Sequence, residues 1–237
     1  MVSPAVEILP LFTGMRLAAC EFLARWEALP DLKNAELIEG IVYLSSPVGF
    51  THGRIDTSVI VWLGQYADET TGCESANNAT CKLLGNLPQP DAFLCVKEEF
   101  GGSSRVQKDF IEGAPELAVE ICTTSAGIDF GPKLALYKRA GVREYITFET
   151  RSKRIVWRML VDGSYHQIRP NAAGILRSHC FPGLWLDTAA LWAGNGKRKR
   201  ETLRAGLESD EHRVFVEQLA RRALELRTNT GGMDFQL

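Results

Sequence analysis

The stretch "GAPELAVEICTTS", residues 113–125, indicates a short buried strand with a charged residue near its centre. Side chains along a strand alternate between its two faces. From residue 117 to residue 122 every side chain except that of Glu120 is small or apolar, so both faces of the strand are expected to be buried. An ionised carboxylate held out of water without a partner costs several kcal/mol. We therefore expect Glu120 to have a partner inside the protein.

Two further charged residues stand where burial is costly. "QPDAFLCV", residues 89–96, has Asp91 directly after Pro90, at the entrance to an apolar strand. The helical pattern over 129–141 has Pro132 at a first-turn position and Lys133 beside it, where the helix dipole disfavours a cation by roughly 0.3–1 kcal/mol. Each residue alone has an ordinary interpretation, as a turn aspartate, a salt-bridged glutamate or a solvated lysine.

Together the three residues suggest chemistry. Two carboxylates on neighbouring strands raise each other's pKa, and a divalent cation between them removes the repulsion. One or two carboxylates are what proteins commonly supply to Mg²⁺, and Mn²⁺ accepts the same ligands. A lysine beside them would orient an attacking water or offset charge on a phosphate. Such a set suits the hydrolysis of phosphodiester bonds.

The hydrophobic periodicity predicts a mixed α/β domain, with helices packed against a central sheet. The first helix is expected at residues 16–29, with its apolar stripe on Leu17, Cys20, Leu23 and Ala24. A second is expected at 52–71, with Ile55, Val59, Trp62 (or Leu63) and Tyr66 as its stripe and Gly72 as its C-cap, and a third at 129–141. Strands are expected at 35–47 (with a turn at Gly40), 79–84, 91–96, 143–150, 154–160 and 164–169, the last two as a hairpin around Asp162 and Gly163. The polar residues 97–112 are expected to form an exposed loop.

The expected organisation has three parts. Residues 1–15 are a lead-in, residues 16–193 form the main domain, and residues 194–237 form a basic linker followed by an amphipathic helix. The linker contains "KRKR", residues 197–200. The helix, from about residue 209 to residue 227, has a narrow apolar stripe of Phe215, Leu219, Ala223 and Leu226.

Composition limits the class of protein. The chain has 237 residues, 45% of them hydrophobic, and a net charge of −2, which argues against a protein that coats nucleic acid through charge alone but leaves room for a local basic groove. No apolar run reaches the roughly 18 residues of a membrane helix, so no membrane partner is expected. The six cysteines form no C-x-x-C pair and no zinc-site spacing. We expect reduced thiols and a cytoplasmic protein.

The ordered set "AELIEG", "SSPVGFTH", "QPDAF", "EGAPELAVEI" and "DFGPKLALYKRAGVREYITFE" resembles the Uma-two family of bacterial endonucleases. The resemblance covers roughly residues 16–192. It implies the PD-(D/E)XK restriction-endonuclease-like fold, which is a mixed central sheet flanked by helices, here with an added C-terminal helix. It also implies a Mg²⁺- or Mn²⁺-dependent endonuclease that acts on nucleic acid, DNA in particular, and that is able to work as a homodimer.

Carried over residue by residue, the resemblance implies catalytic roles for Asp91, Glu120 and Lys133, with Asp91, Glu120 and Glu36 as metal ligands. Supporting positions are Glu36, His52, Gln89 and Asp129, the last as an i,i+4 partner of Lys133. In many members of the superfamily the lysine lies two residues after the second acid, where this chain has Cys122. Uma-type sequences have a helical lysine instead, which Lys133 matches.

The chain departs from the family pattern at Ile41, at residues 123–126 and at Ile146, which leaves room for a weakened site. The alternative function is therefore a non-catalytic regulatory domain on the same scaffold, which would bind nucleic acid or a protein through "KRKR" and the helix that follows. A glycosidase with an acid pair is a third reading, although it gives Lys133 no role.

Overall fold

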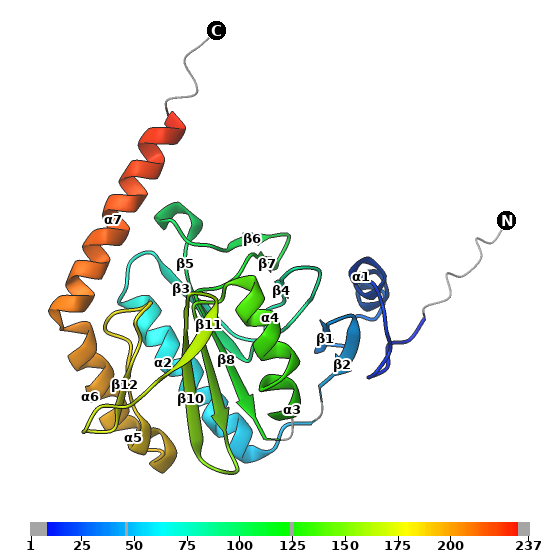
Figure 1. The fold of residues 1–237 in the computed structure, drawn as a ribbon, viewed down its shortest axis with the longest axis horizontal. Coiled ribbons are helices and arrows are strands. Elements are labelled where there is room, and N and C mark those ends of the chain that lie inside the picture. Colours follow the sequence, from blue (N-terminus) through cyan, green and yellow to red (C-terminus); the bar gives the residue numbers. More distant parts are fainter. Residues whose placement is uncertain (1–8, 46, 124–125, 232–237) are drawn as a thin grey trace, which may run out of the picture.

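A computed structural model describes residues 9–45, 47–123 and 126–231. Its centre is a six-stranded sheet in the order β11-β10-β9-β8-β5-β3 (Figure 1). These strands span Cys73–Ala76 (β3), Ala92–Val96 (β5), Leu117–Cys122 (β8), Glu144–Glu149 (β9), Arg154–Val161 (β10) and Ser164–Ile168 (β11). The mixed sheet with flanking helices confirms the predicted fold class. Residues 1–8 of the expected lead-in, Thr124, Ser125 and residues 232–237 lie outside the described residues.

The opening stretch forms the middle of this sheet. β8 pairs in parallel with β9 and antiparallel with β5. Every residue of β5 and β8 is buried. The antiparallel register places Ala92 opposite Val119, so that the preceding Asp91 comes opposite Glu120. The end of β8 and the start of β5 therefore meet at one edge of the sheet.

Helices cover both faces of the sheet. On one face, α2 (Phe50–Asp68) buries Ile55, Val59, Trp62, Leu63 and Tyr66, as its predicted stripe requires. On the other face lie α3 (Ala126–Asp129) and α4 (Pro132–Ala140), and α4 ends at Gly141, whose φ is +85°. The predicted C-cap of α2 is wrong: Glu69 caps the helix in the right-handed region, and Gly72, with a φ of +94°, forms the turn into β3.

A small N-terminal unit packs beside this layer. It consists of α1 (Ala19–Glu27) and the hairpin of β1 (Ala35–Ile38) and β2 (Ile41–Leu44), which turns at Gly40 as predicted. The predicted stripe of α1 is wrong in part: Leu17 and Leu23 are half-buried against the core of this unit, but Cys20 and Ala24 are exposed and Phe22 is the buried residue of the helix. The stripe did not include Phe22, because in a helix of nine residues a single buried aromatic side chain leaves no repeating pattern in the sequence.

The predicted loop at 97–112 is also wrong in part. It contains η1 (Glu98–Phe100), β6 (Arg105–Gln107) and β7 (Phe110–Glu112), and β7 pairs with β4 (Cys81–Lys82) to form a three-stranded sheet. Its polar sequence reflects exposure: only Ile111 among the residues of β6 and β7 is buried. The pair β12 (Ile175–Arg177) and β13 (Trp185–Asp187) was not predicted.

Three helices complete the chain: α5 (Thr188–Ala193), α6 (Gly196–Leu207) and α7 (Asp210–Gly231). The "KRKR" segment, expected in a linker, lies in the first turns of α6. On α7 the predicted stripe buries Phe215, Leu219 and Ala223, but Leu226 is exposed. The six cysteines are free thiols, as expected. Within the described ranges, the model contains no helix with the length and apolar character that crossing a membrane requires.

Candidate active site

Asp91 and Glu120 meet at the edge of the sheet where β5 begins and β8 ends. The backbone N–H of Ile121 donates to Asp91 Oδ2 over 2.5 Å, which holds the Asp91 carboxylate beside the strand residue that follows Glu120. Burial raises the pKa of Asp91, although Lys133 opposes that shift. Burial also raises the pKa of Glu120 well above its usual value, and the carboxylates of Asp129, Asp91 and Glu36 add to the effect.

Lys133 is the partner of Glu120. Its Nζ lies 2.9 Å from Glu120 Oε1, 2.8 Å from Glu36 Oε1 and 4.0 Å from Asp129 Oδ1. Pro132 at the start of α4 directs the chain so that Lys133, in the first turn, faces the sheet rather than solvent. Burial alone would lower the pKa of Lys133, but the carboxylates of Glu120 and Glu36 raise it well above its usual value, so that the ammonium form persists.

The supporting residues differ in where they point. Glu36, on β1, also accepts a bond of 2.6 Å from the backbone N–H of Gln89. The Gln89 side chain donates to Thr80 Oγ1 at 2.9 Å, so Gln89 holds Glu36 through its backbone and the neighbouring loop through its amide. Asp129, the last residue of α3, lies near Lys133 as the i,i+4 spacing predicts, although a break at residues 130–131 separates α3 from α4.

Two tyrosines complete the buried side of the site. The Tyr137 hydroxyl donates to Glu120 Oε1 over 2.8 Å, so the same carboxylate oxygen receives both Lys133 and Tyr137. Tyr145 donates to the backbone carbonyl of Asp129 at 2.9 Å. Sequence reasoning missed Tyr137, although its position four residues after Lys133 places it on the same face of α4 and was the signal available.

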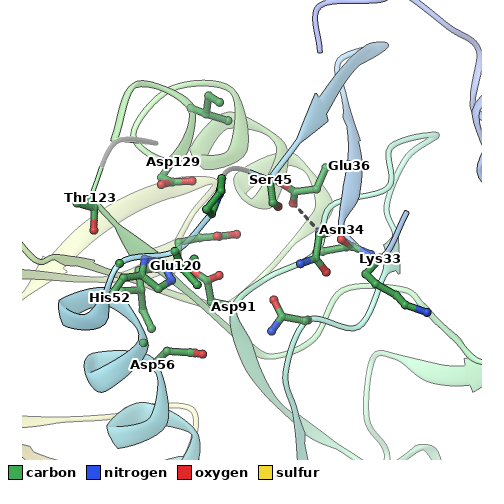
Figure 2. Close-up of a pocket in the computed structure, with 18 of the residues that line it drawn as sticks. Lys33, Asn34, Glu36, Ser45, His52, Asp56, Asp91, Glu120, Thr123 and Asp129 are labelled. Carbon is green, nitrogen blue, oxygen red and sulfur yellow. Dashed lines mark hydrogen bonds between the residues drawn. The ribbon is translucent and has the colours of Figure 1, made fainter. Parts of the chain in front are cut away.

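A cavity of about 750 Å³ opens over these residues. Asp91 and Glu120 point into it from the sheet, while His52 and Asp56 face it from the first turns of α2 (Figure 2). Asp56 was also missed in the sequence. Its Oδ1 is buried without a hydrogen-bond partner, which is unusual for a carboxylate oxygen. Burial raises the pKa of Asp56, and His52 partly offsets this.

The cavity has a strong excess of negative charge. Six carboxylates line it, those of Asp31, Glu36, Asp56, Asp91, Glu120 and Asp129, and only two lysines, Lys33 and Lys133. Carboxylate oxygens are the ligands that Mg²⁺ and Mn²⁺ prefer, and a cation there would offset the excess charge. The donor set therefore fits such a metal in chemistry and charge. The described residues, however, hold no group of three or more His, Cys, Asp or Glu side chains already gathered as metal ligands.

Comparisons with known proteins identify the family and the fold of the chain. A family model described as Uma2, "Putative restriction endonuclease", matches residues 20–189. Among solved structures, the chain resembles a crystal structure from Anabaena variabilis ATCC 29413 described as "a putative nuclease belonging to DUF820". The TM-score is 0.58 and the identity 14%, over 75% of this chain and 98% of the other. That likeness shows a shared fold. No curated protein matches the chain.

Proposed function

Because this chain belongs to the Uma2 family, we propose that it is a metal-dependent endonuclease that hydrolyses phosphodiester bonds in nucleic acid, DNA in particular. One observation carries the proposal: Asp91 and Glu120 come together across β5 and β8, with the buried Lys133 against Glu120. Two acids and a lysine at one edge of the sheet are the groups that this reaction requires of the protein.

The residues that would hold the metal are Asp91 and Glu120, with Glu36 as a further ligand. When bound there, Mg²⁺ or Mn²⁺ supplies Lewis-acid activation of the phosphodiester. Asp91 is already oriented by the backbone N–H of Ile121, and Asp56, whose buried Oδ1 has no hydrogen-bond partner, lines the same cavity. Both features support a cation as the missing partner of this acidic set.

Lys133 contributes a fixed positive charge. Since its raised pKa keeps the ammonium protonated, Lys133 acts as a hydrogen-bond donor and not as a general base. In this role it orients a water for attack and stabilises negative charge that develops on the phosphate. Tyr137 fixes the position of Glu120, and Gln89 fixes that of Glu36.

A second function is favoured by one feature of the same site. Lys133 already bonds to Glu120 Oε1 and Glu36 Oε1, so two of the expected metal ligands have a cationic partner within the protein. This arrangement also suits a non-catalytic binding domain on the nuclease scaffold. Calorimetric titration with Mg²⁺ separates the two, because only the nuclease requires the metal to bind at millimolar concentration or below.

The direct test is cleavage of single- and double-stranded DNA and RNA with Mg²⁺ or Mn²⁺. We expect Asp91→Asn, Glu120→Gln and Lys133→Met each to lower the rate by about 100-fold or more, which is the scale of losing one well-placed catalytic group. Asp109→Asn, at an exposed acid in the turn between β6 and β7, serves as the matched control. Activity that survives both acid substitutions would rule the proposal out.

A further inference from the structure

The acidic cavity does not attract a nucleic acid on its own. Its six carboxylates outnumber its two lysines, so the cavity repels phosphate until a cation binds, and the whole chain has a net charge of −2. Affinity for nucleic acid comes mainly from lysine and arginine contacts to phosphates. If the proposed function holds, a basic surface close to the cavity is therefore required.

One short helix has the required charge. The twelve residues of α6 include Lys197, Arg198, Lys199, Arg200 and Arg204, against the single acid Glu201, which gives a net charge of +4. Lys199 is buried, and its Nζ donates to Ser58 Oγ on α2 at 2.5 Å. That bond fixes the rotation of α6, so that the side chains of Lys197, Arg198 and Arg200 are directed away from the α2 contact.

The packing of α6 places these cations at the end of α2 that lines the cavity. Arg54 of α2 lies beside the turn before α6, since a Cβ added at Gly194 would be 3.1 Å from Arg54 Nη1. Ser58, one turn further along α2, contacts Lys199, so the two helices run in the same direction where they meet. His52, Gly53 and Asp56, in the same turns but on the opposite side of α2, line the cavity. The cations and the cavity therefore flank the N-terminal half of this helix. Figure 1 shows α6 to the left of α2, on the side away from α3 and β1.

The positive charge of Arg54 and of the exposed cations of α6 is only partly neutralised by neighbouring acids. Arg198 pairs with Asp187 at 2.5 Å, and Lys197 lies 3.9 Å from Glu201. In the part of the chain that the structure describes, no ion pair is recorded for Arg54 or Arg200. Burial lowers the pKa of Lys199 to about 8, and the nearby cation Arg200 adds to this shift. The family match ends at residue 189, so α6 is an addition to the shared domain.

We infer that Arg54, Lys197, Arg198 and Arg200 form a basic rim that binds the phosphate backbone of the nucleic acid whose scissile bond enters the cavity. The inference rests on the proposed function and names the surface through which the substrate is held. The rim makes phosphate contacts only, so it contributes affinity without sequence preference.

The test measures binding of a fluorescein-labelled DNA duplex by anisotropy, in calcium buffer, over a series of KCl concentrations. The variants are Arg54→Gln and the double substitution Lys197→Gln with Arg200→Gln. The matched control is Arg221→Gln with Arg222→Gln, at two exposed arginines on α7. They lie far from the cavity, which is at the start of β5: Arg222 is next to Gly101, beyond the end of β5, and a Cβ at Gly101 would be 3.5 Å from Arg222 Cδ.

Each phosphate contact contributes about 0.9 to the slope of log K against log salt concentration. We expect the slope to fall by about 0.9 for Arg54→Gln and about 1.8 for the double variant, with affinity roughly tenfold weaker for each substituted side chain near 0.1 M salt. The control should bind like the wild type. The inference is overturned if the rim variants also bind like the wild type, or if the wild type binds no DNA.

Cleavage assays on the same proteins separate this inference from the proposed function. Cleavage by the wild type together with unchanged binding by the rim variants would overturn the rim and leave the nuclease standing. Weaker binding by the rim variants, together with cleavage that Asp91→Asn does not alter, would support the rim and overturn the assigned catalytic site.

Discussion

Lys133 is one cation among several buried acids. Its Nζ contacts Glu36 from β1, Glu120 from β8 and Asp129 from α3, so a single ammonium joins the N-terminal hairpin to the centre of the sheet. A buried charge that loses its partner costs more than an exposed one, because water cannot replace the missing interaction. Lys133 therefore has a structural role beside its proposed catalytic one.

Replacing Lys133 by Met should destabilise the protein by about 3–5 kcal/mol at neutral pH, since Glu36 and Glu120 would lose their counter-ion. Burial raises the folded-state pKa of Glu120, so the folded protein binds the proton more tightly than the unfolded chain. Stability from that protonation is present at low pH and is lost as pH rises through the folded pKa. The deficit of Lys133→Met should therefore be smaller at pH 5 than at pH 8.

Urea denaturation at the two pH values measures this difference. Lys138→Met is the matched control, because Lys138 is exposed on the same helix. Its effect should stay within about 0.5 kcal/mol at both pH values. An equal deficit for Lys133→Met at pH 5 and pH 8 would contradict the electrostatic account.

At the scale of single residues, the sequence predicts a site residue when that residue is unusual for the element it stands in. A lone acid in an apolar strand singled out Glu120, and an acid after proline singled out Asp91. Tyr137 and Asp56 carry no such anomaly, because a tyrosine or an aspartate on an amphipathic helix is ordinary. Their importance depends on which face of the helix meets the cavity, and that is decided by tertiary packing.

At the scale of elements, Glu144 joins β9 to the segment before β13. It is fully buried, and its carboxylate accepts bonds from Trp157 Nε1, Ser178 Oγ and the backbone N–H groups of His179 and Cys180, over 2.6–2.9 Å. Burial raises the pKa of Glu144, and these bonds oppose the shift. Four donors around one carboxylate make this residue a structural junction.

Glu144→Ala should destabilise the protein by about 3 kcal/mol or more, because several buried donors lose their acceptor together. Glu149→Ala provides the comparison. Glu149 lies on the same strand and pairs with the exposed Arg154, so its removal should cost less than about 1 kcal/mol. Denaturation by urea gives both values. Comparable losses of stability for the two variants would show that the Glu144 network contributes little.

The contribution of the contact between α2 and α6 to the stability of the protein depends on pH. Burial lowers the pKa of Lys199 to about 8, whereas an exposed lysine has a pKa near 10.5. Between these values the unfolded chain binds more protons than the folded protein, so stability rises with pH in that window. Lys199→Met removes this dependence. The variant should be more stable than the wild type at pH 7, and its advantage should shrink from pH 8 to pH 10.

Thermal denaturation of both proteins across that pH range tests the effect. Lys197→Met is the control, since Lys197 is exposed on the same turn of α6. Its difference from the wild type should not vary with pH. A constant difference for Lys199→Met would mean that Lys199 is charged in the folded protein throughout.

Elements with a strong hydrophobic period could be predicted from the sequence. The stripe of α2, the strand with Glu120 and the hairpin at Asp162 and Gly163 all follow from local pattern. The hairpin of β6 and β7 does not, because its strands are three residues long and mostly exposed. The start of α6 was also missed, since its charged residues resemble a linker and only its packing against α2 makes the helix an ordered element.

At the scale of the whole molecule, charge is separated rather than uniform. Six of the carboxylates gather at one cavity, while α6, with a net charge of +4, packs against the helix that lines it. The net charge of −2 conceals both regions. The buried acids raise the free energy of the folded state, and an added cation at the cavity should lower it.

Mg²⁺ or Mn²⁺ should therefore stabilise the folded protein. A ligand at a hundredfold excess over its Kd adds about 2.7 kcal/mol. For a domain of this size that corresponds to a rise in Tm of roughly 5–10 °C. Asp91→Asn and Glu120→Gln should lose most of the shift, and Asp109→Asn should keep it. Because burial raises the pKa of Asp91 and of Glu120, the shift should also weaken as pH falls and these ligands become protonated.

Differential scanning calorimetry at matched ionic strength, with EDTA as the reference, distinguishes this effect from general screening by salt. Screening stabilises the wild type and the Asp91 and Glu120 variants alike, whereas a bound ion acts through those two carboxylates. An equal rise in Tm for the wild type and Asp91→Asn would therefore place the cation elsewhere. No rise at all would mean that Lys133 alone balances the acids, which is the condition expected of the non-catalytic domain.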